Sequence, residues 1–162
     1  MPYSFQLLCG LAVITVTLSS GLFLTFSDFV MRSLKLSQPR AGIEAMQTIN
    51  REIFKSLTMV LLIGNVALTA GLAGFSYLAN PASLATGLLI TAATLYAFGA
   101  LGLTFAFNVP MNNRLDKWAH DSQEAASYWQ TYVPRWTFWN YGRAIATTAS
   151  AICILIALPT LS

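Results

Sequence analysis

The sequence has few charged residues, and this shortage excludes most classes of soluble protein. Asp, Glu, Lys and Arg make up 9% of the 162 residues, against about a quarter in an ordinary soluble domain. With 56% apolar residues and a mean hydropathy of +0.60, too little polar surface remains to cover a soluble domain of this size. The composition therefore predicts an integral membrane protein in contact with the lipid bilayer.

The uncharged residues fall into four continuous stretches, 7–30, 57–78, 84–107 and 145–158, which contain one charged residue, Asp28. Each stretch approaches the roughly 20 residues that a helix needs to cross a hydrocarbon core about 30 Å thick. The apolar residues do not alternate with polar ones, which favours helices over barrel strands. We predict one all-α domain over residues 1–162, a four-transmembrane-helix bundle with amphipathic connector helices on one side. The expected spans are 5–32, 56–79, 83–107 and 135–159, and the expected connectors are 33–55 and 108–134.

The basic residues predict the orientation. All nine lie in the two connectors or at the helix ends beside them, whereas the turn 80–83 and both terminal segments have none. By the positive-inside rule, the connectors face the cytoplasm and both termini lie on the non-cytoplasmic side. The net charge of +3 reflects this bias. Because the basic residues are spread out and mixed with acids, we expect no nucleic-acid partner.

Residues for metal or redox chemistry are scarce. The chain has one histidine, His120, and two cysteines in separate spans, Cys9 and Cys153, so it lacks the local spacing of a zinc or haem site. No nucleotide-binding or serine-hydrolase motif is present. We predict no metal and no cofactor. The spacing leaves open whether the cysteines form a disulfide or are two small buried side chains.

Each connector contains helix-start signals. Gln38-Pro39 indicates a break followed by a new amphipathic helix, because proline suits the first helical position. In the second connector, the segment from Asn108 to Arg114 is rich in Asn and Pro and is expected to end the third span. Asp121 followed by Glu124 resembles a helix cap, and Pro134 indicates the start of the fourth span.

Several polar residues are expected at the cytoplasmic end of the bundle. Asp28 is a candidate catalytic residue because an ionisable group inside a span is costly, and Arg143 at a similar depth is its expected ion-pair partner. The alternative is that the pair only fixes helix register. Four amides are expected at the same end, Asn50, Asn108, Asn112 and Asn140. They would either orient a ligand or an oxyanion, or satisfy broken helix ends.

The second connector also concentrates aromatic residues, among them Trp118, Trp136 and Tyr141. An interfacial aromatic belt explains such residues in many membrane proteins. So many aromatics beside Asn and Arg would also suit a pocket for a flat aromatic or quinone-like molecule. Trp136 is the best pocket candidate, because it shares a helical stripe with Asn140 and Arg143.

Three segments carry a family resemblance: Phe26–Met31, the Met-Gln-x-Ile-Asn-Arg sequence at 46–51, and the Asn-x-Pro-x-Asn sequence at 108–112, together with Trp118, Trp129, Trp136 and 140–143. With these motifs the chain resembles the DUF1772 family of four-helix membrane proteins, which includes the fungal anthrone oxygenases. The resemblance covers nearly the whole chain. It implies a cofactor-independent oxygenase that removes an acidic C–H proton and passes an electron to oxygen. One departure is Tyr141, where many relatives have a histidine that would be the base.

We therefore predict an anthrone-oxygenase-like oxidoreductase with Asp28, Asn140 and Arg143 as catalytic candidates. The predicted binding residues are Asn50, Asn108, Asn112, Trp118, Trp136 and Tyr141. The alternative is a non-enzymatic membrane protein that binds a lipid, a quinone or a partner subunit. An enzyme predicts a cavity reached from the membrane beside Asn50, Asn112, Asn140 and Arg143, whereas a scaffold predicts that these groups satisfy one another without a void. The sequence leaves homo-oligomerisation open.

Overall fold

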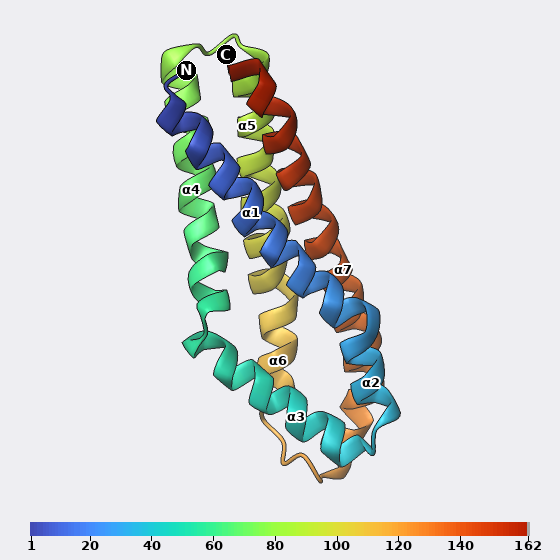
Figure 1. Ribbon diagram of the computed structural model, residues 1–162. Helices are drawn as coiled ribbons and strands as arrows, with labels where there is room; N and C mark the ends of the chain where they lie inside the picture. The colour runs from blue at the N-terminus through green and yellow to red at the C-terminus, as the bar shows by residue number, and fades with distance from the viewer. Residues whose placement is uncertain (162) are drawn as a thin grey trace.

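The computed structural model describes residues 1–161, which form only helices and short connections (Figure 1). Four helical segments are long and apolar enough to cross a membrane: Tyr3–Leu36, Leu57–Ala79, Leu84–Leu115 and Gln123–Leu161. The predicted all-α bundle with four spans is confirmed. The protein is an integral membrane protein whose helices contact the lipid bilayer.

The elements that make up these segments are as follows. The first segment consists of α1 (Tyr3–Thr25), the π-helical turn η1 (Phe26–Val30) and α2 (Met31–Leu36). A connecting helix α3 (Pro39–Glu52) and the 3-10 turn η2 (Ile53–Lys55) lead to α4 (Leu57–Ala79). The third segment consists of α5 (Leu84–Thr94), the π-helical η3 (Leu95–Gly102) and η4 (Thr104–Asn108), and α6 (Val109–Leu115). The fourth consists of α7 (Gln123–Ala157) and the 3-10 turn η5 (Leu158–Leu161).

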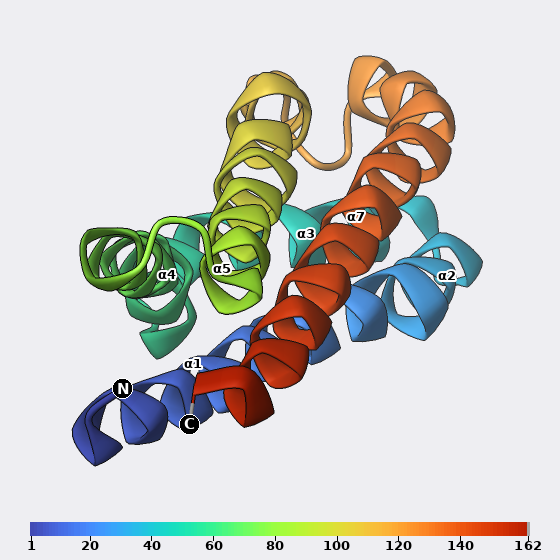
Figure 2. The ribbon, with the colours of Figure 1, turned by 90° about the horizontal axis from the view of Figure 1, so that it is seen from above.

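Along the middle of α1, small side chains face the bundle and large ones face outward. On α1, Ala12 and Val16 are fully buried, whereas Leu11 and Leu18 are about half exposed. Small inward residues let helix backbones approach closely in a membrane, where burying large apolar side chains gives little advantage over contact with lipid. As a result α1 and α5 both pack along α7, and α4 packs against α1 and α5 (Figure 2).

The two ends of the bundle are built differently. Both chain termini lie at one end, where the Met1 ammonium group donates to the Leu161 carbonyl at 2.9 Å. At the other end α3 lies across the bundle (Figure 1). The break predicted at Gln38-Pro39 is confirmed, because α3 begins with Pro39 in its first turn. The thiols of Cys9 and Cys153 are both free.

The expectation that residues 108–114 end the third helix is wrong, because the helix continues to Leu115. Proline lacks an N–H donor and its ring needs space on the preceding turn. The widened π-helical turn η4 lies directly before Pro110 and provides that space. A helix can therefore pass through this proline.

The fourth long helix also begins earlier than predicted. The helix α7 runs without interruption for 35 residues and contains Pro134 in its interior. Its cap is Ser122, not Asp121: the Ser122 hydroxyl accepts from the Ala125 amide at 3.1 Å. Buried Tyr132, Val133 and Trp136 on both sides of the proline hold the helix against the bundle. In this region only residues 116–122 lie outside the helices.

Candidate functional site

A cavity of about 120 Å³ lies at the α3 end of the bundle. One water molecule needs roughly 10–15 Å³ of such volume, so the cavity has room for a larger guest. Its walls are mainly apolar, with polar side chains from α3, α4, η4, α6 and α7. The polar lining residues are Asn50, Thr58, Thr104, Asn108, Asn112, Asn140 and Arg143, and the apolar lining includes Phe23, Phe26, Met46, Leu101 and Trp136.

Among residues 1–161, Arg143 is the only charged one in the lining. Its side chain is 7% exposed. Its Nε donates to Asn140 Oδ1 at 3.0 Å, and its Nη1 donates to Thr104 Oγ1 at 2.9 Å. Its Nη2 also donates to Asn140 Oδ1. Its Cζ lies 4.3 Å from the centre of the Phe23 ring and 5.5 Å from that of Trp136. Within residues 1–161 it forms no ion pair with a carboxylate, so the buried positive charge is balanced only by dipoles and aromatic rings.

The expected ion pair between Asp28 and Arg143 is wrong. Asp28 is exposed on the outer side of η1, and the preceding residue, Ser27, faces inward. Asn140 Nδ2 donates to Ser27 Oγ and to the Phe23 carbonyl, both at 2.6 Å. The short hydroxyl at this position gives Asn140 an acceptor at a far smaller desolvation cost than a carboxylate would. Asp28 does not line the cavity.

A second polar group lies nearer to α3. Asn112 Oδ1 accepts from Tyr132 Oη at 2.8 Å and from Trp136 Nε1 at 2.9 Å. Asn50 Nδ2 approaches the same Tyr132 oxygen at 3.5 Å, a distance at which a hydrogen bond is weak. These contacts fix the indole plane of Trp136, which stands against Phe26 with 6.1 Å between ring centres.

Asn108 has an unused acceptor. Its side chain is 1% exposed, and its Nδ2 donates to the Trp136 carbonyl at 3.2 Å. Its Oδ1 is buried beside the cavity and has no hydrogen-bond partner. An unsatisfied buried acceptor costs about 1–3 kcal/mol. A ligand that donates a hydrogen bond to this oxygen would remove that cost.

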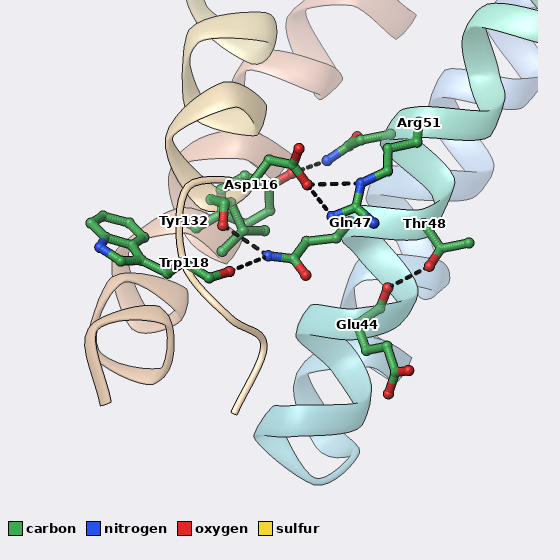
Figure 3. Close-up of polar contacts among 9 residues, drawn as sticks. Glu44, Gln47, Thr48, Arg51, Asp116, Trp118 and Tyr132 are labelled. Carbon is green, nitrogen blue, oxygen red and sulfur yellow. Dashed lines mark hydrogen bonds and ion pairs between the residues drawn. The ribbon is translucent and has the colours of Figure 1, made fainter. Parts of the chain in front are cut away.

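Helix α3 closes one end of the cavity, and Gln47 holds α3 against residues 115–118. Gln47 Nε2 donates to the carbonyls of Leu115 at 2.9 Å and Trp118 at 3.0 Å, and Arg51 pairs with Asp116 at 2.6 Å (Figure 3). Gly42 allows close approach, because a Cβ there would collide with the Leu34 carbonyl oxygen. Met46, Asn50 and Ile53 then face the cavity.

The cavity opens on one lateral face. Phe54 on η2, Ile63 on α4 and Phe105 on η4 line it and are each more than half exposed. The helix α4 packs against α5 and η3 but not against η4 or α6, and these elements stand apart toward the α3 end (Figure 1). Apolar, exposed side chains on the rim of a membrane protein face the acyl chains of the bilayer. The rim of the opening is therefore apolar, as a surface in contact with lipid would be.

The family model described as anthrone oxygenase matches residues 53–153. This is well over half of the chain. The chain belongs to the anthrone oxygenase family. The matched region contains the polar residues that η4, α6 and α7 contribute to the cavity, whereas α1 and α3 lie before it. No curated protein and no solved structure matches the chain.

In this member of the anthrone oxygenase family, two predicted binding residues lie away from the cavity. Trp118 stands beside Tyr128 with 5.4 Å between ring centres, under the Arg114 guanidinium. Tyr141 is 38% exposed and points outward. His120 also lies outside the lining, near Glu44. Within residues 1–161, no three His, Cys, Asp or Glu side chains gather to hold a metal ion.

Sequence reasoning missed Ser27, Gln47 and Thr104. Hydroxyl residues are common in membrane helices, so Ser27 and Thr104 carry no signal of their own. Gln47 could have been found, because it shares one α3 face with Ile43 and Met46, both buried. A glutamine on a buried apolar face needs partners.

Proposed function

We propose that this protein is an oxidoreductase of the anthrone oxygenase type that binds a planar, membrane-soluble aromatic molecule as its anion in the cavity. The observation that carries this proposal is the buried Arg143 guanidinium without a carboxylate. A buried, unpaired charge is costly, so the cavity favours a ligand that supplies the missing negative charge. The aromatic and aliphatic walls favour a flat apolar body.

The chemistry of an anthrone-type substrate fits this arrangement. Its reacting carbon is a CH2 group between two aromatic rings, across from a ketone. Loss of one proton gives an enolate whose negative charge lies mainly on the ketone oxygen. One electron passes to dioxygen, a C–O bond forms to give a hydroperoxide, and loss of water leaves a second ketone, so CH2 and O2 become C=O and H2O. Arg143 would stabilise the enolate oxygen as a preorganised donor.

Three further groups would orient the substrate. The free Asn108 Oδ1 would accept from a phenolic hydroxyl, and Trp136 would stack on a ring. Asn112, which holds Trp136 in place, would fix that orientation. Arg143 and Asn108 come from different helices, so a ligand that bonds to both must have its polar groups in a matching geometry.

The residue types that the cavity lining lacks favour a second, non-catalytic function. It has no Asp, Glu, His, Cys or Tyr, and so no side chain with the ordinary pKa of a general base. An oxygenase built this way must bind a substrate acidic enough to ionise without a protein base. The alternative is a protein that holds an aromatic anion or quinol without turning it over.

We further propose that the substrate enters sideways from the bilayer between α4 and η4, past Phe54, Ile63 and Phe105. The α3 end would face the cytoplasm, because the basic residues gather there. A route from the membrane suits a substrate that partitions into lipid. A route from water would pass the polar contacts between α3 and residues 115–118.

The test is oxygen uptake by the protein in lipid nanodiscs with anthrone as substrate, with anthraquinone formation followed by absorbance. The expected result is turnover above the protein-free rate by the natural sequence and by Ser150→Ala, a control at the far end of α7, and its loss in Arg143→Gln. Anthrone binding without turnover would support the non-enzymatic alternative. Equal rates in the natural protein and Arg143→Gln would contradict the proposed function.

A further inference from the structure

A second hollow lies outside the cavity, between α6 and the first half of α7. It has a volume of about 320 Å³ and is lined by Pro110, Met111, Arg114, Tyr128, Thr131 and Arg135. None of these residues lines the cavity. An adjoining hollow shares Arg114, Tyr128 and Thr131 with it and also includes Glu124. The two together form a groove at the α3 end of the bundle.

The groove has two guanidinium groups with no carboxylate partner. Arg114 Cζ stands 4.6 Å from the centre of the Tyr128 ring and 5.7 Å from that of Trp118. Within residues 1–161, neither Arg114 nor Arg135 forms an ion pair, whereas Arg51 and Lys55 pair with Asp116 and Glu52. Ring contacts orient Arg114 but do not neutralise it. The Tyr128 and Thr131 hydroxyls are further donors in the groove.

Apolar aromatic surface lies farther toward the terminal end, on the same two segments. The rings of Phe107 on η4 and Trp139 on α7 stack with 3.5 Å between centres, and Phe138 is 66% exposed. A ligand for the groove thus has an anionic head that two arginines can bind and an apolar tail that lies along these rings. Guanidinium groups bind phosphate oxygens through paired, charge-assisted hydrogen bonds, and basic pockets between membrane helices bind lipid head groups.

We propose that this groove is a binding site for an anionic phospholipid, whose phosphate is held by Arg114 and Arg135. The lipid's acyl chains lie along Phe138 and the stacked pair of Phe107 and Trp139. The site is separate from the cavity and does not depend on the proposed oxygenase activity.

The test is native mass spectrometry of the detergent-solubilised protein titrated with phosphatidylglycerol and, in parallel, phosphatidylcholine. The double variant R114Q/R135Q is compared with R32Q/R40Q, which removes the same charge from two exposed arginines on α2 and α3. We expect phosphatidylglycerol affinity to fall at least tenfold in R114Q/R135Q and less than twofold in R32Q/R40Q. The natural protein should prefer phosphatidylglycerol to phosphatidylcholine.

Two further measurements distinguish a lipid site from loss of the ring contacts and from a site for free phosphate. Arg114 touches two aromatic rings, so R135Q alone is measured as a variant that leaves those contacts in place; it should still weaken phosphatidylglycerol binding by about threefold or more. Inorganic phosphate at millimolar concentration should not displace the lipid. Equal losses in both double variants, unchanged affinity in R135Q, or displacement by phosphate would overturn the proposal.

Discussion

The two ends of the bundle use polar residues in different ways. At the terminal end and in the adjoining half of the membrane, the buried polar groups are hydroxyls with short-range partners: Ser76 and Thr86 bond to each other at 2.7 Å, and Ser150 donates to the Ala92 carbonyl at 2.8 Å. Cys9 and Ala12 are fully buried and belong to the apolar core. Each of these hydroxyls is satisfied, and the helices stay close together.

At the α3 end the buried polar groups include amides and one guanidinium as well as hydroxyls, and several of them border a cavity. Asn140 and Arg143 bind groups on η1 and η4, while Asn108 Oδ1 lacks a partner. A hydroxyl network that satisfies itself stabilises packing, whereas an unpaired cation and an unused acceptor beside a void cost stability. This difference supports our proposal that the terminal end is the scaffold and that the α3 end binds a ligand.

The largest expected effect comes from Arg143→Gln. It should lower the affinity for an ionised hydroxyanthraquinone by about 100-fold, because a hydrogen bond to a charged group contributes about 1.5–3 kcal/mol. Fluorescence titration in nanodiscs measures the affinity. Ser150→Ala at the opposite end should leave it unchanged. A similar loss in both variants would remove the distinction between the two ends.

The next effect concerns how α3 closes the cavity. Gly42→Ala places a Cβ against the Leu34 carbonyl oxygen, a backbone atom that cannot move aside. We expect it to destabilise the fold by about 1–3 kcal/mol, the usual cost of overpacking, with a lower thermal unfolding midpoint. Gly74→Ala on α4 is the matched control, because nothing lies within 4 Å of its Cβ position. Equal midpoints for the two variants would show that α3 does not need close contact with α2.

Asn108→Leu should change binding and stability differently. It removes an unpaired buried acceptor but also the hydrogen bond from Nδ2 to the Trp136 carbonyl. These two effects oppose each other, so the unfolding midpoint should change little, while affinity for a phenolic ligand falls about tenfold with the loss of one hydrogen bond to the ligand. Asn65→Leu is the contrast, because Asn65 bonds to Thr15, Ser19 and Tyr96. That variant should lower stability and leave affinity unchanged. The reverse pattern would place the ligand at the middle of the bundle.

The smallest expected effect belongs to Arg51→Gln, which breaks the exposed ion pair with Asp116. Exposed pairs contribute about 0–1 kcal/mol. Gln47→Leu beside it should cost more, because it leaves two carbonyls without a donor. Chemical unfolding of both variants gives the comparison. A larger cost for Arg51→Gln would mean that the surface pair, not the buried amide, binds α3.

The sequence predicts the class of fold because charge is so unevenly distributed along it. Helix ends in the second connector are harder to predict, since both Pro110 and Pro134 lie inside helices. A π-helical turn accommodates the first, and buried neighbours hold the helix at the second. Neither effect is visible in local sequence signals.

The candidate site is predicted in part. Asn50, Asn108, Asn112, Trp136, Asn140 and Arg143 do border one cavity. Asp28 does not, because the register of η1 turns Ser27 inward instead, and a register inside a π-helical turn does not follow from ordinary helical spacing. The roles of the cavity residues in binding and catalysis remain predictions.

The most direct test of a ligand site at the α3 end is a crystal structure of the protein soaked with a brominated hydroxyanthraquinone, with bromine located by anomalous scattering. We predict bromine inside the cavity, a ring against Trp136 and a ligand oxygen within hydrogen-bond distance of Arg143. A saturated complex with the bromine on the lipid-facing surface, and the cavity empty, would contradict it.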